Sequence, residues 1–209
     1  MQWRWSGFRN SPWITSCWTS QYSASWKNLV SGKGTVCQRL KRLRRFLSRA
    51  SPEFRLIYTA LRQCGARPGE LCRATIADID QTANTIILRE HKTARKTGKP
   101  RRIPIGRKLG ELLAQAIGDR QAGPIFLSPA GKAWRVPNLS RTYSRLRDNA
   151  GLSHELVLYL ARHECGTKIC REKGIEFARR MLGHANISTT QRYMHLDERK
   201  LADAQDLVE

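Results

Sequence analysis

The sequence predicts a mainly α-helical domain with one small antiparallel β-sheet, an α+β class. Apolar residues recur at helical spacing in several segments after residue 50, and two short segments rich in β-branched residues flank a turn rich in Lys, Arg and Gly. A third observation sets the limits of the domain. Acidic residues and regular apolar patterning both begin only after residue 50.

The first predicted helix begins at Pro52. Ser51 is a residue type that caps helix N-termini, and proline is favoured at the first helical position because its missing N–H needs no partner there. Gly65 ends the helix. The apolar stripe between these limits consists of Phe54, Ile57, Tyr58 and Leu61.

Residues 85–89 and 102–105 are the two predicted strands, and the basic turn between them predicts an antiparallel pair. Residues 76–80 are a candidate third strand. Further helices are predicted at 107–118, 138–149, 159–172, 175–182, 188–194 and 197–207.

Residues 1–50 differ in composition from the rest of the chain. They contain ten Lys/Arg and no acidic residue, and five of the six tryptophans lie in residues 1–26. Only Leu40, Leu43 and Leu47 suggest a short basic helix. We expect residues 1–50 to be a poorly ordered leader and residues 51–209 to form the folded domain. The alternative for the leader is a DNA-binding arm, because basic and aromatic side chains together grip nucleic acid.

The charge of the chain indicates a polyanionic partner. Lys and Arg number 38 against 17 Asp and Glu, which gives a formal net charge of +21. Such an excess favours nucleic acid over an anionic membrane, because membrane-surface helices pair their cations with a large apolar face. The sequence has neither an apolar run of the ~20 residues that span a bilayer nor a secretory signal. We therefore expect a cytoplasmic, nucleoid-associated protein with no membrane partner.

The six cysteines show no CxxC pair and no zinc-ligand spacing with the five histidines. Reduced, mostly buried thiols are the expectation for an intracellular chain. We expect no metal and no cofactor. The cysteines are Cys17, Cys37, Cys64, Cys72, Cys165 and Cys170.

Short motifs in a fixed order carry the strongest functional signal. The stretch 160–193 resembles the C-terminal half of the tyrosine recombinases, also called phage integrases. That family carries an LRH motif, a Thr four residues after the His, a Gly turn, an LGH motif, a Thr pair and then a Tyr. These elements appear here as Arg162-His163, Thr167, Gly174, Leu182-Gly-His184, Thr189-Thr190 and Tyr193. With Arg67-Pro-Gly-Glu70, the resemblance extends upstream to about residue 52 and covers roughly three quarters of the chain.

The resemblance implies that Arg67 and Arg162 bind the phosphate that is cut, and that Glu70 braces the active-site arginine. A phosphodiester is an anion, and more negative charge develops in the transition state. Two guanidiniums can neutralise the non-bridging oxygens with bidentate hydrogen bonds. Preorganised donors of this kind are often worth about 3–4 kcal/mol each.

Tyr193 is implied as the nucleophile that forms a 3′-phosphotyrosyl intermediate. A phenol has a pKa near ~10, so it needs a cationic neighbourhood or a base to attack at neutral pH. His184 is implied to hydrogen-bond a non-bridging oxygen. Lys92, in the predicted hairpin, is implied as the general acid for the leaving 5′ oxygen. The hairpin residues expected to bind the DNA backbone are Arg95, Lys96, Lys99 and Arg101.

Two departures from the family pattern stand out. The family usually places a His three residues before the second arginine, where this chain has Tyr159. We interpret Tyr159 as a variant group in contact with substrate, or as a sign of reduced activity. The second departure is the missing helical DNA-clamping domain, since residues 1–50 are too short and irregular to supply it.

The predicted function is site-specific breaking and rejoining of double-stranded DNA, by four subunits on two sites or a monomer free in solution. Residues 197–207 are expected to dock on a neighbouring subunit. One alternative is a truncated or decayed integrase that acts only as a DNA-binding protein. Another is a type IB topoisomerase-like enzyme, which shares the chemistry without site specificity. An RNA-binding module ranks last, because no RNA-binding motif is present.

Overall fold

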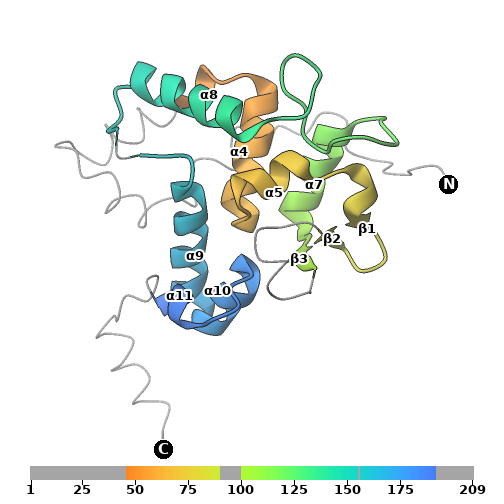
Figure 1. Ribbon diagram of the computed structural model, residues 1–209, viewed down its shortest axis with the longest axis vertical. Coiled ribbons are helices and arrows are strands. Elements are labelled where there is room, and N and C mark those ends of the chain that lie inside the picture. Colours follow the sequence, from red (N-terminus) through yellow and green to blue (C-terminus); the bar gives the residue numbers. More distant parts are fainter. Residues whose placement is uncertain (1–45, 90–99, 155, 192–209) are drawn as a thin grey trace, which may run out of the picture.

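The computed structural model describes residues 46–89, 100–154 and 156–191 (Figure 1). It is mainly helical with a small sheet, which confirms the predicted class. The longer helices are α4 (Pro52–Cys64), α7 (Arg107–Ile117), α8 (Val136–Asn149), α9 (Leu160–Lys173) and α10 (Ile175–Leu182). The short helices are α5 (Pro68–Arg73), the 3-10 turn η1 (Ile76–Asp78) and α11 (Ser188–Gln191), and the strands are β1 (Ile79–Asp80), β2 (Thr85–Leu88) and β3 (Arg101–Pro104).

Helix α4 forms for the reasons that the sequence indicates. The Ser51 hydroxyl accepts a hydrogen bond from the Phe54 N–H at 3.3 Å, Pro52 occupies the first position, and Gly65 ends the helix in the left-handed conformation. The predicted apolar stripe is buried. Helix α4 packs against α9 on one side and α7 on another, so it is the central helix of the fold.

The three strands form an antiparallel sheet in the order β1-β2-β3, with Ile86 opposite Ile103. The candidate third strand is only partly extended. Its first half is the turn η1, because the Asp78 carboxylate accepts hydrogen bonds from the backbone N–H and the hydroxyl of Thr75. Asp and Thr at this spacing close a short helical turn and leave two residues for β1.

Helix α5 was not predicted, because six residues are too few to show an apolar period. Local signals start it: Pro68 occupies the first helical position, and the Glu70 carboxylate accepts the Arg67 backbone N–H at 2.7 Å. Helix α8 begins two residues earlier than predicted, because Pro137 is accommodated in its first turn. The predicted helix at 188–194 is described only up to Gln191, and that at 197–207 lies outside the described residues.

An aromatic cluster forms the part of the core between α4 and α8. Phe46 is 1% exposed and packs edge-on against Phe54, Tyr58 and Tyr143, with ring centroids 6.3, 5.6 and 5.3 Å away. Trp134 packs against Phe54 from the other side. Phe46 is therefore part of the core, although it lies on the N-terminal side of the predicted boundary at residue 50.

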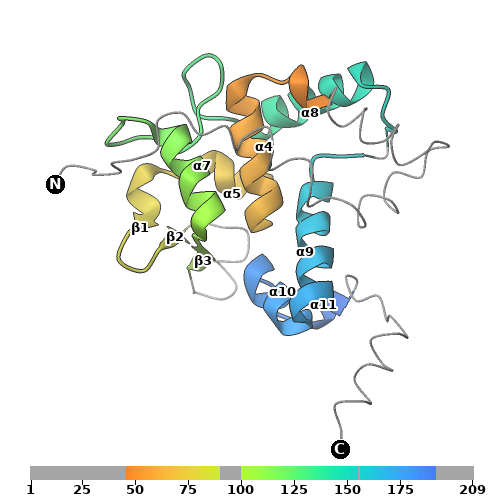
Figure 2. The same ribbon diagram turned by 180° about the vertical axis from the view of Figure 1, so that it is seen from behind.

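Helices α9, α10 and α11 form a group beside α4 and the sheet, as the two opposite views show (Figures 1 and 2). Helix α10 packs closely on α9. Gly65 joins the two parts at a close approach: a Cβ on it would lie 2.7 Å from Leu182 Cδ2 and 3.0 Å from Cys165 Sγ. Glycine is needed there both for this contact and for its φ of 59°.

Candidate active site

Arg162 lies in the first turn of α9 and is 1% exposed. Its Nη1 donates to the carbonyl of Gly65 at 2.6 Å and its Nη2 donates to the carbonyl of Leu182 at 2.7 Å. Gly65 follows α4 and Leu182 is the last residue of α10, so both acceptors lie at helix C-termini, where the helix dipole is negative. Arg162 therefore connects three helices and is stabilised by two of their ends.

Glu70 lies beside two arginines and is 2% exposed. Its Oε1 accepts from Arg67 Nη1 at 2.9 Å, and its Oε2 accepts from the Arg67 backbone N–H and forms an ion pair with Arg101 Nη1. Arg101 Nη2 also donates to the Met181 carbonyl at 3.3 Å. The carboxylate thus joins α5 to β3, and Arg101 extends the connection to α10.

The cluster has more positive than negative charge, with the guanidiniums of Arg67, Arg101 and Arg162 around the single carboxylate of Glu70. Burial lowers the pKa of Arg162, and the positive charges of Arg101 and Arg67 lower it further. Burial raises the pKa of Glu70, but Arg101 and the two hydrogen bonds from Arg67 outweigh this, so the net shift is downward. Such a cationic excess favours binding of an anion.

Arg101 corrects one prediction. We expected it to bind the DNA backbone from the hairpin, but its side chain is only 3% exposed and pairs with Glu70. The alternation of β3 explains this, because Arg101 and Ile103 face inward while Arg102 and Pro104 face outward. The composition of a basic segment does not show which of its residues face the core and which face solvent.

His184 is positioned by the turn that ends α10. Its backbone N–H donates to the Arg179 carbonyl at 3.0 Å, and its ring Nδ1 lies 2.9 Å from the Thr190 hydroxyl of α11. Thr190, which the sequence marked only as half of a Thr pair, is fully buried. The preceding Gly183 has a φ of 66°, and a Cβ on it would lie 3.1 Å from Arg101 Nε. The motif therefore has glycine at this position because the Arg101 side chain approaches the backbone closely there.

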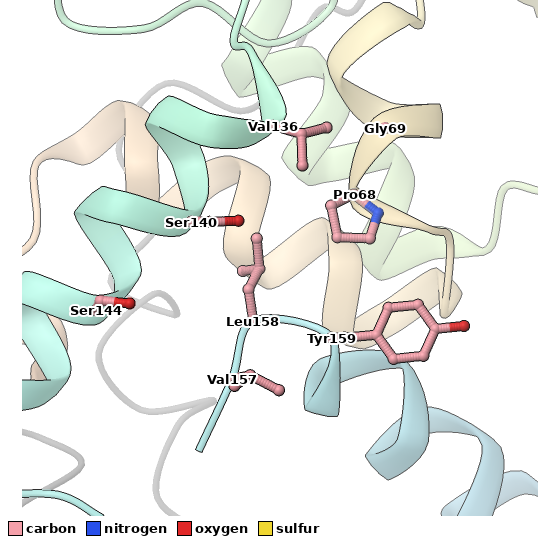
Figure 3. Close-up of a pocket in the computed structure, with 8 residues that line it drawn as sticks. All are labelled: Pro68, Gly69, Val136, Ser140, Ser144, Val157, Leu158 and Tyr159. Atoms are coloured by element: carbon pink, nitrogen blue, oxygen red, sulfur yellow. The ribbon is translucent and has the colours of Figure 1, made fainter. Parts of the chain in front are cut away.

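Tyr159 occupies the N-cap position of α9 without a capping hydrogen bond from its side chain, and it is 41% exposed, with its ring edge-on to His163 at 5.3 Å. It lies near enough to Arg162 for the two groups to interact electrostatically. Figure 3 shows its phenolic oxygen on the side away from α8. Tyr159 therefore lies at the edge of the arginine cluster, in the position where the family usually has an imidazole.

A largely apolar groove of about 370 Å³ runs beside the cluster, from the residue after Arg67 to Tyr159 (Figure 3). It separates the start of α5 from one face of α8. The residues that line it are Pro68, Gly69, Val136, Ser140, Ser144, Val157, Leu158 and Tyr159.

The structure brings together Arg67, Glu70 and Arg162, and the turn that carries His184 adjoins them through Leu182 and Gly183. Tyr193, Lys92, Arg95, Lys96 and Lys99 lie outside the described residues. Within the described ranges, no group of three or more His, Cys, Asp or Glu side chains is arranged to hold a metal ion. None of the described helices combines the length and apolar character needed to cross a membrane.

Comparisons with known proteins identify the family. The model of the Phage integrase family matches residues 38–200. The tyrosine recombinase XerC of Proteus mirabilis is 31% identical over 149 residues, which are 68% of this chain and 47% of that protein. The chain spans about half the length of the curated relatives it matches.

Solved structures share the fold. A lambda integrase dimer bound to a COC′ core site gives a TM-score of 0.63 at 23% identity, covering 79% of this chain and 47% of that one. A lambda integrase tetramer bound to a Holliday junction gives 0.61 at 21% identity, covering 78% and 47%. With a family model that covers most of its length and a catalytic-domain fold built around Arg67, Glu70 and Arg162, the chain belongs to the phage integrase family.

Proposed function

We propose that this chain is a site-specific DNA recombinase that breaks and rejoins strands through a 3′-phosphotyrosyl intermediate on Tyr193. The observation that carries the proposal is the arginine cluster. Arg67 and Arg162 are 95 positions apart in the sequence, yet both lie near the buried carboxylate of Glu70. A fold gains little from burying like charges together, so such a cluster is typical of a site for an anion. We also propose that the chain acts on the nucleoid, in the cytoplasm.

In the proposed reaction, Arg67 and Arg162 neutralise the non-bridging oxygens of the scissile phosphate. The side chain of Arg67 is 21% exposed, so it is the guanidinium through which an anion first reaches the cluster. Arg162 acts from a buried position, held by the carbonyls of Gly65 and Leu182. His184 completes the set of donors, its ring fixed by Thr190.

The covalent step exchanges one phosphate ester for another. The Tyr193 phenol gives up its proton to water as its oxygen bonds to phosphorus and the bond from phosphorus to the 5′ oxygen breaks. Lys92 gives that 5′ oxygen its proton and takes one back from water. The phosphotyrosyl ester retains the free energy of the broken bond. A 5′ hydroxyl of the recombining strand then attacks it and releases Tyr193, so rejoining needs no ATP.

The proposed assembly is a tetramer on two DNA sites. The lambda integrase that shares this fold forms a dimer on a core site and a tetramer on a Holliday junction. The net charge of +21 supports binding to double-stranded DNA. Arg95, Lys96 and Lys99 remain the residues proposed to hold its backbone.

The test uses a pool of nicked DNA duplexes with a randomised central sequence, since the target site is unidentified. After incubation and denaturation, the wild-type chain should retain labelled DNA covalently and Tyr193→Phe should retain none. Tyr22→Phe, in the N-terminal segment, is the matched control and should behave as wild type. An adduct that persists in Tyr193→Phe would overturn the assignment of the nucleophile.

Non-enzymatic DNA binding is the second candidate, and Tyr159 in place of the usual imidazole favours it. For this candidate, the duplex pool should bind with an affinity that falls steeply with salt concentration, and no covalent adduct should form with the wild-type chain.

A further inference from the structure

Arg101 is the one hairpin cation within the described residues whose side chain is directed into the domain. It is the first residue of β3, which follows the basic segment 90–99, and its side chain is 3% exposed. Burial of a guanidinium costs free energy unless its partners compensate for it. The residues that compensate for Arg101 therefore indicate its role.

Those partners belong to two elements far apart in the sequence. Arg101 Nη1 pairs with Glu70 on α5, 31 residues away, and Nη2 donates to the Met181 carbonyl on α10, 80 residues away. Its stem passes close to Gly183, where a Cβ would lie 3.2 Å from Arg101 Cδ. The base of the hairpin, the bracing carboxylate and the turn before His184 thus meet at one side chain.

The ion pair between Arg101 and Glu70 also affects Arg67, because the two arginines share one carboxylate. Glu70 Oε2 interacts with Arg101 while Oε1 accepts from Arg67 Nη1. Arg101 therefore supplies much of the positive charge that keeps Glu70 ionised, and its interaction with Glu70 lowers the pKa of that carboxyl. Without Arg101, the full negative charge of Glu70 would act on Arg67 and draw its guanidinium inward, away from a bound phosphate.

We propose that Arg101 is a positioning residue: it neutralises Glu70 so that the Arg67 guanidinium stays available to the scissile phosphate, and it fixes the hairpin base to the turn that carries His184. This inference rests on the proposed recombinase function and deepens it. Arg101 acts through Arg67 and His184 and does not itself contact the DNA.

The first test measures the rate of covalent adduct formation at saturating DNA with Arg101→Met and Arg101→Lys. The Met variant should react about 10- to 100-fold more slowly, somewhat less than the loss typical of a direct oxyanion donor, because its effect is indirect. The Lys variant should recover part of the rate, since it restores the charge but not both hydrogen bonds. The salt concentration for half-maximal DNA binding should change little in either variant.

The second test separates charge balance from a purely structural role. Adding Glu70→Gln to Arg101→Met removes the unbalanced carboxylate, so the double variant should react faster than Arg101→Met alone. A role confined to stability predicts the opposite, because the double variant loses further contacts. A double variant as slow as or slower than the single one would overturn the proposal.

Two matched controls complete the design. Arg102→Met removes the same charge from the adjacent, outward-facing position of β3 and should alter DNA affinity but not the rate at saturation. Arg120→Met removes a guanidinium that binds the carbonyls of Ile117 and Pro124, outside the cluster, and should lower thermal stability without slowing the folded protein. If the wild-type chain forms no adduct, the proposed function fails. If it does, and Arg101→Met reacts at the wild-type rate, only this inference fails.

Discussion

At the scale of single residues, Arg162 shows why the family motif requires arginine and not merely a cation. Its planar fork donates to two carbonyls that belong to different helices, at 2.6 and 2.7 Å. An ammonium carries charge at one point and cannot reach both acceptors with the same geometry. The residue therefore has a structural role in addition to its proposed role at the phosphate.

Arg162→Lys should lower the free energy of unfolding by about 1–3 kcal/mol, because at least one buried carbonyl loses its donor. Urea denaturation followed by circular dichroism measures this. Arg171→Lys is the control, since Arg171 is exposed and pairs with the exposed Glu172. Equal stability of the two variants would contradict the structural role of Arg162.

The four described cysteines are free and buried, as the sequence predicts, while Cys17 and Cys37 lie outside the described residues. Burial raises the pKa of Cys64 to about 11 and that of Cys165 to about 12. Because the thiolate is the reactive form, both thiols should resist modification in the native state.

A variant with Cys17→Ser and Cys37→Ser allows this to be measured with a colorimetric disulfide reagent at pH 8. Cys64 and Cys165 should react at least about 100-fold more slowly in buffer than in denaturant, because two or more units of raised pKa reduce the thiolate fraction by that factor. Rapid native labelling of either thiol, mapped by mass spectrometry, would show that α4 and α9 are not packed as described.

At the scale of elements, the short pieces of the fold depend on contacts with distant parts of the chain. Helix α5 has six residues and β3 has four, too few to be stable alone. The ion pairs of Glu70 hold α5 to β3. The protonation state of one carboxyl therefore affects the assembly of several elements.

The stability conferred by Glu70 should depend on pH. Because its pKa in the folded state lies below the ordinary 4.5, the ionised group stabilises the fold above about pH 4.5, and this contribution disappears as the pH falls through the lowered pKa. Glu70→Gln should be less stable than wild type at pH 7, and the urea midpoints of the two should converge as the pH falls below 4.5. Glu111→Gln, which loses only an exposed pair with Arg107, should follow the wild-type curve. A constant offset between Glu70→Gln and wild type across this range would contradict the assignment.

At the scale of the whole molecule, the aromatic cluster includes a residue that precedes the composition break near residue 50. Phe46 contacts rings from α4 and α8, so the segment before α4 belongs to the core. The composition break near residue 50 marks the end of the unusual N-terminal segment but not the first packed residue. Composition is an average over a window, whereas packing depends on a single side chain.

Phe46→Ala should lower the free energy of unfolding by about 3–5 kcal/mol, the range for removing a buried aromatic ring. A chain that starts at residue 51 should be destabilised at least as much. Arg55→Ala, on the exposed face of α4, should cost little and serves as the control. Thermal melts of the three proteins test this, and a chain from residue 51 as stable as the full chain would exclude Phe46 from the core.

Much of the fold and part of the site could be predicted from local patterns. The limits of α4, α9 and α10 followed from caps, apolar spacing and glycine, and each predicted limit lies within about one residue of the observed one. The motifs selected Arg67, Glu70, Arg162 and His184. Arg67 forms an ion pair with Glu70, and Arg162 donates to the Leu182 carbonyl in the turn before His184. These features depend on residues close in sequence, which is why a single chain discloses them.

The sequence by itself determined the helical class, the family motifs and the cationic character, because each depends only on residue types and on short spacings along the chain. Only the tertiary structure decided that α5 is held against β3, that Phe46 belongs to the core, and that Arg101 faces Glu70 and not solvent. The physical reason is distance along the chain: burial of a charge depends on partners 31 and 80 residues away, and no local pattern specifies which side chains will meet there.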